Sequence, residues 1–224
     1  YRENRTEPLI LRDGEETLEH PIEEFYFGTY APDDGGWLES RLDGPLLDAG
    51  AGVGKHALYF QEHFETVAIE VSENLVETMR DRGVADARQA DMFALPEAFD
   101  RDRFQSALVY GTQIGLAGSL PGLRAFLADL ARVTTPDATV VLDSYDPTVE
   151  EVSELLGYRD HPSPGLAHRV MSFEYEDEVG ETLLFVLVSP DRLREATVGT
   201  PWEVVDVDES RGSPIHYLAA LSKG

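Results

Sequence analysis

A glycine-rich turn is the first feature of this chain whose residue types suit ligand binding. In the stretch LLDAGAGVGKHALYF, residues 46–60, an apolar run is followed by closely spaced glycines and then by a helix-like segment. Glycines let the backbone come close to a ligand, and a helix that starts directly after a buried strand commonly holds a nucleotide. The turn therefore predicts a nucleotide-binding or phosphate-binding loop.

Two well-known loops fit this turn only in part. A phosphate-binding loop needs two glycines separated by four residues, then Lys and Ser or Thr. Here Ala49 stands at the first glycine position and His56 at the hydroxyl position. A dinucleotide-binding loop, G-x-G-x-x-G, has Lys55 in place of its third glycine. An NTPase is disfavoured, and an NAD-dependent oxidoreductase stays open as an alternative.

Three acidic side chains stand near the ends of successive strand-like segments. Asp48 closes the first, Glu70 ends TVAIE, and Asp91 follows a weak strand. The carboxyl ends of parallel strands meet at one edge of a sheet, so these carboxylates are expected to lie together. An acid at the position of Glu70 can accept hydrogen bonds from both ribose hydroxyls. Asp91 has a second interpretation, as the cap of a following helical turn.

These residues carry a resemblance to a known family. The pattern D-x-G-x-G-x-G, matched by Asp48, Gly50, Gly52 and Gly54, resembles motif I of the class I S-adenosylmethionine-dependent methyltransferases. The resemblance extends over roughly residues 46–146, and it implies S-adenosylmethionine as cofactor and S-adenosylhomocysteine as product. The cofactor-binding residues that it implies, with Tyr26 added from an aromatic segment near the N-terminus, are Asp48, Ala49, Gly50, Gly52, Glu70, Val71, Asp91, Met92, Tyr110, Gly111 and Tyr26.

Strand-like and helix-like segments alternate from residue 45 onward. They predict an α/β fold with a doubly wound, mostly parallel, seven-stranded Rossmann-like sheet, an antiparallel C-terminal strand and an inserted β-hairpin. Strands are predicted at residues 45–49, 66–70, 85–90, 104–110, 138–143, 202–207 and 215–221, and helices at 55–63, 72–80 and 120–133, with a short helix capped by Ser189.

The chain shows no linker, so a single methyltransferase domain is predicted for residues 1–224. Residues 1–41 are a polar lead-in, 42–146 the cofactor-binding core, and 191–224 a C-terminal helix and strand pair. Residues 147–190 contain two strand-like runs around DEVGE, which predict the inserted hairpin. This hairpin is a candidate cover for the acceptor site.

Acidic residues dominate the charge of the chain. Asp and Glu number 43 against 18 Lys and Arg, which gives a formal net charge of −25, and Lys55 and Lys223 are the only lysines. Such a composition resembles the surfaces of proteins from salt-in halophilic archaea, where molar salt screens the repulsion between carboxylates. Nucleic acid is a disfavoured partner, because no basic stripe is present to meet phosphates.

Absent residue types narrow the possibilities further. The chain has no cysteine, which excludes disulfides, thiolate zinc sites and a cysteine nucleophile. No clustered set of His, Asp and Glu is visible, so no metal is predicted. No apolar run is long enough for a membrane helix, and the charged first residues lack the apolar core of a signal peptide. A cytoplasmic protein is therefore expected.

The methyl acceptor is predicted to be a small molecule. No Asn-Pro-Pro-Tyr segment follows the fourth strand, where nucleic-acid and protein-glutamine N-methyltransferases carry it. The glycine-rich YGTQIGLAGSLPGL resembles a segment of small-molecule methyltransferases instead. In-line methyl transfer depends mostly on positioning, so a general base is optional. The attacking atom and the oligomeric state stay open, as does a non-catalytic protein that binds S-adenosylmethionine or S-adenosylhomocysteine.

Acceptor contacts are expected from segments over the carboxyl ends of the strands. Asp143, at the end of the fifth strand, and Tyr145, just after it, are the candidates for orienting or activating the acceptor, and His161 and His168 are candidate loop bases. The aromatic lead-in is either a lid over the cofactor or a packing contact with the sheet edge; its residues are Phe25, Tyr26, Phe27 and Tyr30.

Overall fold

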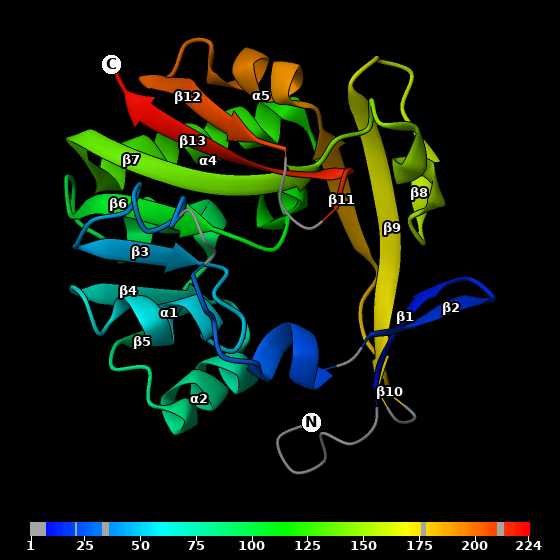
Figure 1. The fold of residues 1–224 in the computed structure, drawn as a ribbon, viewed down its shortest axis with the longest axis horizontal. Helices are drawn as coiled ribbons and strands as arrows, with labels where there is room; N and C mark the ends of the chain where they lie inside the picture. The colour runs from blue at the N-terminus through cyan, green and yellow to red at the C-terminus, as the bar shows by residue number, and fades with distance from the viewer. Residues whose placement is uncertain (1–7, 21, 33–35, 176–177, 210–212) are drawn as a thin grey trace.

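A mixed seven-stranded sheet forms the centre of the protein (Figure 1). The structure is a computed structural model that describes residues 8–20, 22–32, 36–175, 178–209 and 213–224. In spatial order the strands are β12 (Trp202–Asp208), β13 (His216–Lys223), β7 (Thr134–Tyr145), β6 (Phe104–Val109), β3 (Leu46–Ala49), β4 (Thr66–Glu70) and β5 (Ala87–Gln89). Strands β7, β6, β3, β4 and β5 are parallel. β13 runs antiparallel to both of its neighbours, β7 and β12. The predicted mostly parallel sheet with an antiparallel C-terminal strand is thus confirmed.

Helices cover both faces of this sheet. One face packs against α3 (Leu95–Ala98), α4 (Leu120–Val133) and α5 (Pro190–Thr197), and the other against α1 (Lys55–Phe60) and α2 (Glu73–Arg82). Among the described residues, none of the helices has the length and apolar character needed to cross a membrane. Shorter helical turns are η1 (Glu23–Phe27), η2 (Met92–Ala94), η3 (Gln113–Ala117) and η4 (Glu150–Glu154).

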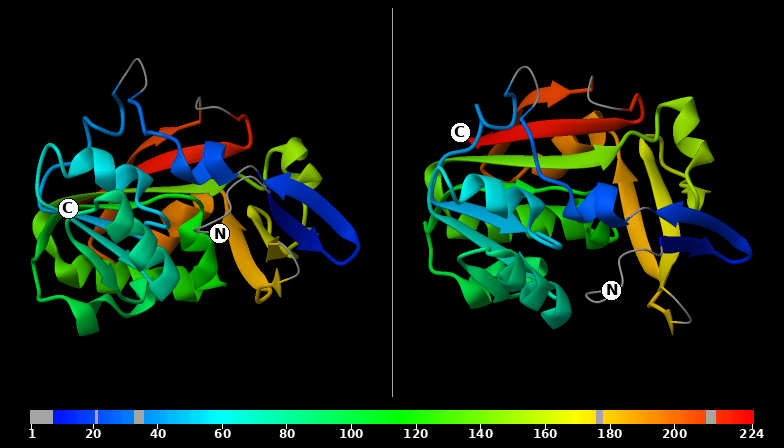
Figure 2. Two further views of the ribbon diagram at one scale, coloured as in Figure 1. Left: turned by 90° about the horizontal axis from the view of Figure 1, so that it is seen from below. Right: turned by 60° about the horizontal axis from the view of Figure 1, so that its bottom comes forward.

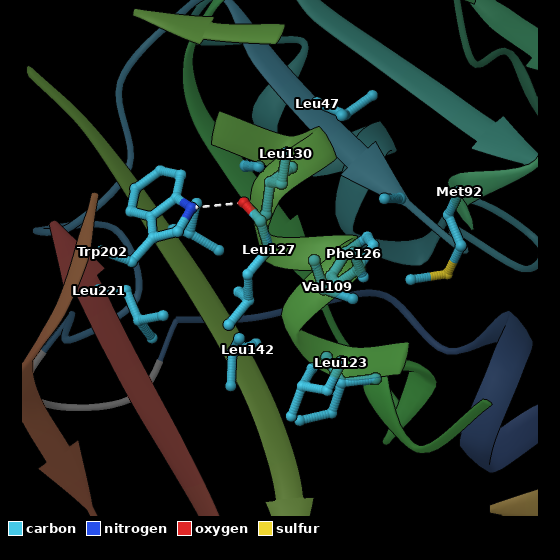
Figure 3. Packing of buried hydrophobic residues seen from close by; sticks show 14 of the residues in the cluster. Leu47, Met92, Val109, Leu123, Phe126, Leu127, Leu130, Leu142, Trp202 and Leu221 are labelled. Atoms are coloured by element: carbon cyan, nitrogen blue, oxygen red, sulfur yellow. Dashed lines mark hydrogen bonds between the residues drawn. The ribbon is translucent and has the colours of Figure 1, made fainter. Parts of the chain in front are cut away.

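The core beneath α4 shows why this region is firmly packed. The apolar residues of α4 recur every three or four positions, so they form one buried stripe against the sheet. Ser119 begins the helix, because its hydroxyl accepts a hydrogen bond from the Gly122 N–H. Trp202 closes one end of the core, and its Nε1 donates to the Leu127 carbonyl at 2.8 Å (Figure 3). The C-terminal strand pair is thereby fixed to the helix layer.

A second, six-stranded sheet lies beside the carboxyl ends of the parallel strands, and the sequence analysis did not predict it (Figures 1 and 2). Its central strand β9 (Leu166–Tyr175) pairs antiparallel with β11 (Leu183–Val188), as expected for a hairpin. The other strands are β1 (Leu9–Asp13), β2 (Glu16–His20), β8 (Tyr158–Asp160) and β10 (Glu178–Val179).

The division into lead-in and hairpin is therefore wrong in detail. Residues 9–20 form two strands, and β1 pairs with residues 172–174 of β9. Leu11 of β1 is buried in the same cluster as Phe185 of β11. Short segments such as LILRD and ETLEH carry a weak strand pattern, and β1 joins a larger sheet only by pairing with the distant strand β9.

Several element boundaries also differ from the prediction. β7 begins at Thr134, whose hydroxyl donates to the Leu130 carbonyl, and it continues to Tyr145 because β13 pairs along its whole end. α1 ends at Phe60, and β5 is confined to residues 87–89. Ser72 precedes α2, but its side chain makes no capping hydrogen bond. Parts of the DEVGE turn and of the connection between β12 and β13 lie outside the described residues.

Candidate functional site

The glycine turn between β3 and α1 is held against β4 by its backbone. The Gly50 N–H donates to the Ile69 carbonyl at 3.1 Å. Gly50, Gly52 and Gly54 have φ values of +72°, +58° and +79°, a region that other residues rarely adopt. A side chain at Gly54 would meet Val84 at 2.7 Å, whereas nothing lies within 4 Å of a Cβ built at Gly52. Gly54 therefore serves packing, and Gly52 borders open space.

Asp48, at the end of β3, is a buried acid next to this turn. It is 2% exposed, and its Oδ2 has no hydrogen-bond partner among the described residues. Burial raises the pKa of Asp48 to about 7, a hydrogen bond from the Ala57 N–H opposes the rise, and Glu70 adds to it. A buried carboxylate oxygen without a donor is costly. The site suits a ligand that brings a donor or a positive charge.

Glu70, the last residue of β4, reaches back across the turn. Its Oε2 accepts a hydrogen bond from the Gly52 N–H at 3.2 Å. Its Oε1 accepts from the N–H groups of Val71, at 2.9 Å, and Ser72, at 3.3 Å. The carboxylate consequently lies beside the open space at Gly52, where it can accept hydrogen bonds from a diol.

The remaining residues expected at this edge take different positions. Oδ1 of Asp91 accepts a hydrogen bond from the Phe93 N–H at 2.8 Å, so Asp91 caps η2 as its second interpretation proposed. Met92 and Ala49 are buried in the core cluster that contains α4. Asp91 and Val71 are exposed beside the turn, so they are accessible to a ligand.

Arg82 of α2 fastens the lead-in to the glycine turn. Its guanidinium donates to the carbonyls of Tyr26 at 3.2 Å and Phe27 at 3.1 Å, both in η1, and to the carbonyl of Val53 at 2.8 Å, in the turn. Tyr30, in contrast, packs against the cluster on the α1 face of the sheet. The lead-in thus approaches the turn through η1 and packs on the sheet through Tyr30.

Asp143 lies within β7, not at its end, and connects two distant segments. It is 1% exposed, and both its oxygens accept from the Thr112 N–H, at 2.9 and 3.0 Å. Oδ2 also lies 2.7 Å from Nε2 of His216. Thr112 has φ +59°, a strained value for this residue, which directs its N–H toward Asp143. A carboxylate only accepts hydrogen bonds, so Nε2 carries the hydrogen and Nδ1 is left as an acceptor.

His216 is a candidate site residue that was not predicted from the sequence. It is the first residue of β13 and pairs opposite Tyr145 of β7. Its side chain is 15% exposed, and its Nδ1 makes no hydrogen bond with any described residue. The available signal was the antiparallel pairing of the last strand with the fifth, which places the start of the last strand beside Tyr145. Nothing in the local sequence marks this histidine.

Tyrosines surround the Asp143–His216 pair and connect it to an arginine. The His216 ring centroid lies 5.6 Å from that of Tyr145 and 6.3 Å from that of Tyr110. Arg169 of β9 lies 5.9 Å from the Tyr145 ring. Burial raises the pKa of Tyr110 to about 12 and that of Tyr26 to about 12, so both hydroxyls are neutral at pH 7. The cluster presents neutral hydroxyls, a histidine and a guanidinium.

The turn after β6 joins this cluster to the glycine turn. Gly111 precedes Thr112 and has φ +93°. The Tyr110 ring lies 4.5 Å from that of His56 in α1, and burial, with a smaller effect of Lys55, lowers the pKa of His56 to about 4. The side chain of Gln113 lies against Gly50, where a Cβ would meet it at 2.9 Å. Residues 110–113 therefore touch both groups of side chains.

The two loop histidines proposed as bases form a separate contact. The His161 and His168 rings lie 5.1 Å apart, and His168 is part of β9 instead of a loop. Within the described ranges, no group of three or more His, Asp or Glu is placed to hold a metal ion.

Comparison with known proteins gives two matches that bear on function. Residues 46–137 match a family model described as a methyltransferase domain. A SAM-dependent methyltransferase from Bacteroides fragilis, solved in complex with S-adenosyl-L-homocysteine, aligns with a TM-score of 0.78 at 25% identity. That alignment covers 100% of this chain and 90% of the other. No curated protein matches the chain by sequence.

Two other solved structures share the fold at lower identity. A glycopeptide N-methyltransferase aligns with a TM-score of 0.62 and 19% identity, over 89% of this chain and 92% of the other. An amino pentose methyltransferase from Micromonospora echinaspora, solved with SAM bound, aligns with a TM-score of 0.57 and 17% identity, over 80% and 83% of the two chains. At such identities the likeness shows the fold alone.

Proposed function

We propose that this protein, which is an S-adenosylmethionine-dependent methyltransferase, methylates a small molecule at an oxygen or nitrogen that carries a proton. The cofactor is S-adenosylmethionine, in keeping with the full-length likeness to an enzyme solved with S-adenosyl-L-homocysteine. The proposed position of the cofactor rests on one observation. Oδ2 of Asp48 is buried without a hydrogen-bond partner among the described residues, beside the open space at Gly52. When bound, S-adenosylmethionine supplies a methyl group activated by its positively charged sulfur.

Different residues of the chain are proposed to bind different parts of this cofactor. Asp48 faces the ammonium and sulfonium end, where positive charge stabilises a buried carboxylate. Glu70 accepts hydrogen bonds from the ribose hydroxyls, and Asp91 accepts one from the adenine amine with the oxygen that does not cap η2. The backbone and side chains that complete this site are Ala49, Gly50, Gly52, Val71, Met92, Tyr110, Gly111 and Tyr26.

His216 is the group we assign to the acceptor proton. Asp143 holds Nε2 of its ring, so Nδ1 is oriented as a proton acceptor next to Tyr145 and Tyr110. An acceptor atom that gained the methyl group and kept its proton would carry a positive charge. The acceptor proton passes to Nδ1, which prevents positive charge from remaining on the product.

A small acceptor is supported by the confined setting of this cluster. Asp143 is buried, the His216 side chain is mostly so, and the second sheet packs around Tyr145. Such buried groups suit a small acceptor better than an extended polymer. One protein of the same fold is an amino pentose methyltransferase, which agrees with a small acceptor.

The function is tested by measuring S-adenosylhomocysteine released from S-adenosylmethionine in molar KCl, with and without a fractionated extract of small metabolites. We expect release that depends on at least one fraction. Calorimetry with S-adenosylhomocysteine and NAD checks the cofactor: the first should bind and the second should not. Glu70→Ala should weaken that binding by about 1–3 kcal/mol, from lost charge-assisted hydrogen bonds. The exposed Glu62→Ala, after α1, is the control and should bind like the wild type.

We also propose that the protein works at high salt, in a potassium-rich cytoplasm. The support is the formal charge of −25, which repels itself in dilute buffer and is screened in molar salt. We expect the melting temperature to rise steeply between dilute buffer and molar KCl. Equal melting temperatures in the two solutions would remove this proposal and leave the methyltransferase function untouched.

A further inference from the structure

Arg169 is a buried cation for which the chain provides little compensation. It is 9% exposed and sits in β9. Its Nε donates to the Leu156 carbonyl at 2.9 Å, and within the described part of the chain its two terminal nitrogens make no hydrogen bond and no ion pair. Buried charges are normally paired, because their loss of hydration is otherwise uncompensated. The guanidinium therefore has two donor groups available for something other than the fold.

Other arginines of this chain are placed differently. Arg12, Arg159 and Arg192, for example, each pair with a carboxylate, those of Glu174, Asp13 and Glu195. With 43 acidic residues in the chain, a counter-charge would be easy to supply to any arginine. Arg169 instead faces aromatic rings, with Tyr145 at 5.9 Å, and its electrostatic partners are the hydroxyls of Tyr145 and Tyr26. Both hydroxyls are neutral at pH 7, so they do not balance the charge.

The position of Arg169 links it to the proposed acceptor site. Tyr145 lies between Arg169 and His216, in ring contact with the histidine and beneath the guanidinium. Tyr26 comes from η1, the same turn whose carbonyls Arg82 ties to the glycine turn. Arg169, contributed by the second sheet, is thus connected to His216 through the Tyr145 ring.

We propose that the methyl acceptor carries an anionic group, a carboxylate or a phosphate, and that Arg169 binds it through its two terminal nitrogens. This inference rests on the proposed function, because it names the class of acceptor for that site. A planar guanidinium recognises both groups through two parallel hydrogen bonds. With the anion on Arg169, the acceptor spans Tyr145 and presents its nucleophilic atom to His216. The second sheet therefore selects the acceptor by charge.

The test is anion binding by the protein saturated with S-adenosylhomocysteine, measured by calorimetry at constant KCl. The probes are benzoate and phenyl phosphate, with benzamide and phenol as neutral counterparts. We expect at least one anion to bind about tenfold or more tightly than its neutral counterpart. The anion that is preferred shows whether the acceptor's anionic group is a carboxylate or a phosphate. Arg169→Met should abolish this preference, and Arg169→Lys should retain part of it, since it keeps the charge but loses the paired donors.

The control is Arg159→Met, on the neighbouring strand β8, whose guanidinium is more exposed and pairs with Asp13. It should bind the anions like the wild type. Circular dichroism and S-adenosylhomocysteine affinity show whether each Arg169 variant is folded. If S-adenosylhomocysteine binds but neither anion is preferred, or if Arg169→Met and Arg169→Lys both bind them normally, the inference is overturned and the proposed function stands. If S-adenosylhomocysteine does not bind the wild type, the proposed function fails, and this inference with it.

Discussion

The proposed cofactor side and the proposed acceptor side of the site are built in different ways. On the cofactor side, the functional groups follow directly after strands, and Glu70 bonds to Val71, Ser72 and the nearby Gly52. On the acceptor side, Asp143 meets a histidine 73 positions further along the chain, and Arg169 comes from another sheet. A local turn therefore forms the first side, while the second exists only after the two sheets have packed.

The two sides also differ in charge. Asp48 and Glu70 make the cofactor side acidic, whereas on the acceptor side Asp143 is bonded to His216 and Arg169 supplies a cation without a carboxylate partner among the described residues. Each sign opposes that of its proposed ligand, a cationic cofactor and an anionic acceptor. Since the chain as a whole is strongly acidic, the basic groups are the more informative ones: general surface charge does not account for them.

The largest effect is expected from removing the proposed base, His216, while the cofactor side is left unchanged. For His216→Gln we expect turnover to fall by about 10²–10⁴-fold, because the acceptor proton loses its acceptor. Affinity for S-adenosylhomocysteine should stay unchanged, as measured by calorimetry alongside steady-state turnover. His63→Gln, at an exposed position after α1, is the control and should keep full activity. A parallel loss of cofactor affinity in His216→Gln would show that the two sides are not independent.

Asp143→Asn examines the positioning of the same histidine. An asparagine amide can donate to Nε2, which favours the ring form with the hydrogen on Nδ1 and removes the base. In ¹⁵N NMR of His216 we expect the Nε2–H form in the wild type and a shift toward the other form in the variant. The turnover of the variant should also fall, because a ring with its hydrogen on Nδ1 cannot accept the acceptor proton there. An unchanged ring form would mean that Asp143 does not orient His216.

A smaller effect, on the cofactor side, follows from the raised pKa of Asp48. Below pH 7 its carboxyl is largely protonated in the free protein, and the ammonium group of S-adenosylhomocysteine binds best to the ionised form. Affinity for S-adenosylhomocysteine should therefore rise about tenfold from pH 6 to pH 8. Asp48→Asn should bind more weakly and lack this rise, which calorimetry at the two pH values measures. Subtracting the variant also removes any titration of the ligand itself.

The raised pKa of Asp48 also affects stability, but with the opposite dependence on pH: affinity should rise with pH, whereas the free energy of unfolding should fall. In the unfolded chain Asp48 loses its proton near its ordinary pKa of 3.8, whereas the folded protein holds it up to about 7. The free energy of unfolding should consequently fall as pH rises through that interval, because the folded state binds the extra proton. Asp48→Asn should lack this contribution and be more stable than the wild type at pH 8. A less stable variant would mean that Oδ2 has a partner within the protein.

The smallest expected effect concerns the connection between the lead-in and the glycine turn. Arg82→Gln loses hydrogen bonds to the carbonyls of Tyr26 and Phe27, so η1 should be held less firmly over the cofactor. We expect a decrease of about 1 kcal/mol in binding free energy for S-adenosylhomocysteine, measured by calorimetry. Arg80→Gln, on the same helix but bonded to the Ala87 carbonyl, is the matched control. Equal weakening by both variants would attribute the effect to α2 instead of η1.

Prediction from the sequence succeeded where the signal was local. The glycine turn and the strand ends at Asp48 and Glu70 were recognised because residue type and spacing define them directly. Asp91 was placed correctly next to its helical turn, where its side chain does cap the backbone. The second sheet was missed because β1 and β2 are short, and β9, to which β1 pairs, lies far along the chain.

The sequence by itself determined the parallel sheet, the glycine turn and the acids at the strand ends, because short-range periodicity and backbone geometry encode them. Only the tertiary structure decided that Asp143 is buried within β7, that His216 is its partner and that Arg169 faces the same cluster. The reason is physical: the charge of a buried side chain is decided by what surrounds it, and those surroundings come from strands distant in sequence. The proposed cofactor side can therefore be predicted from the sequence, whereas the proposed acceptor side becomes visible only in the tertiary structure.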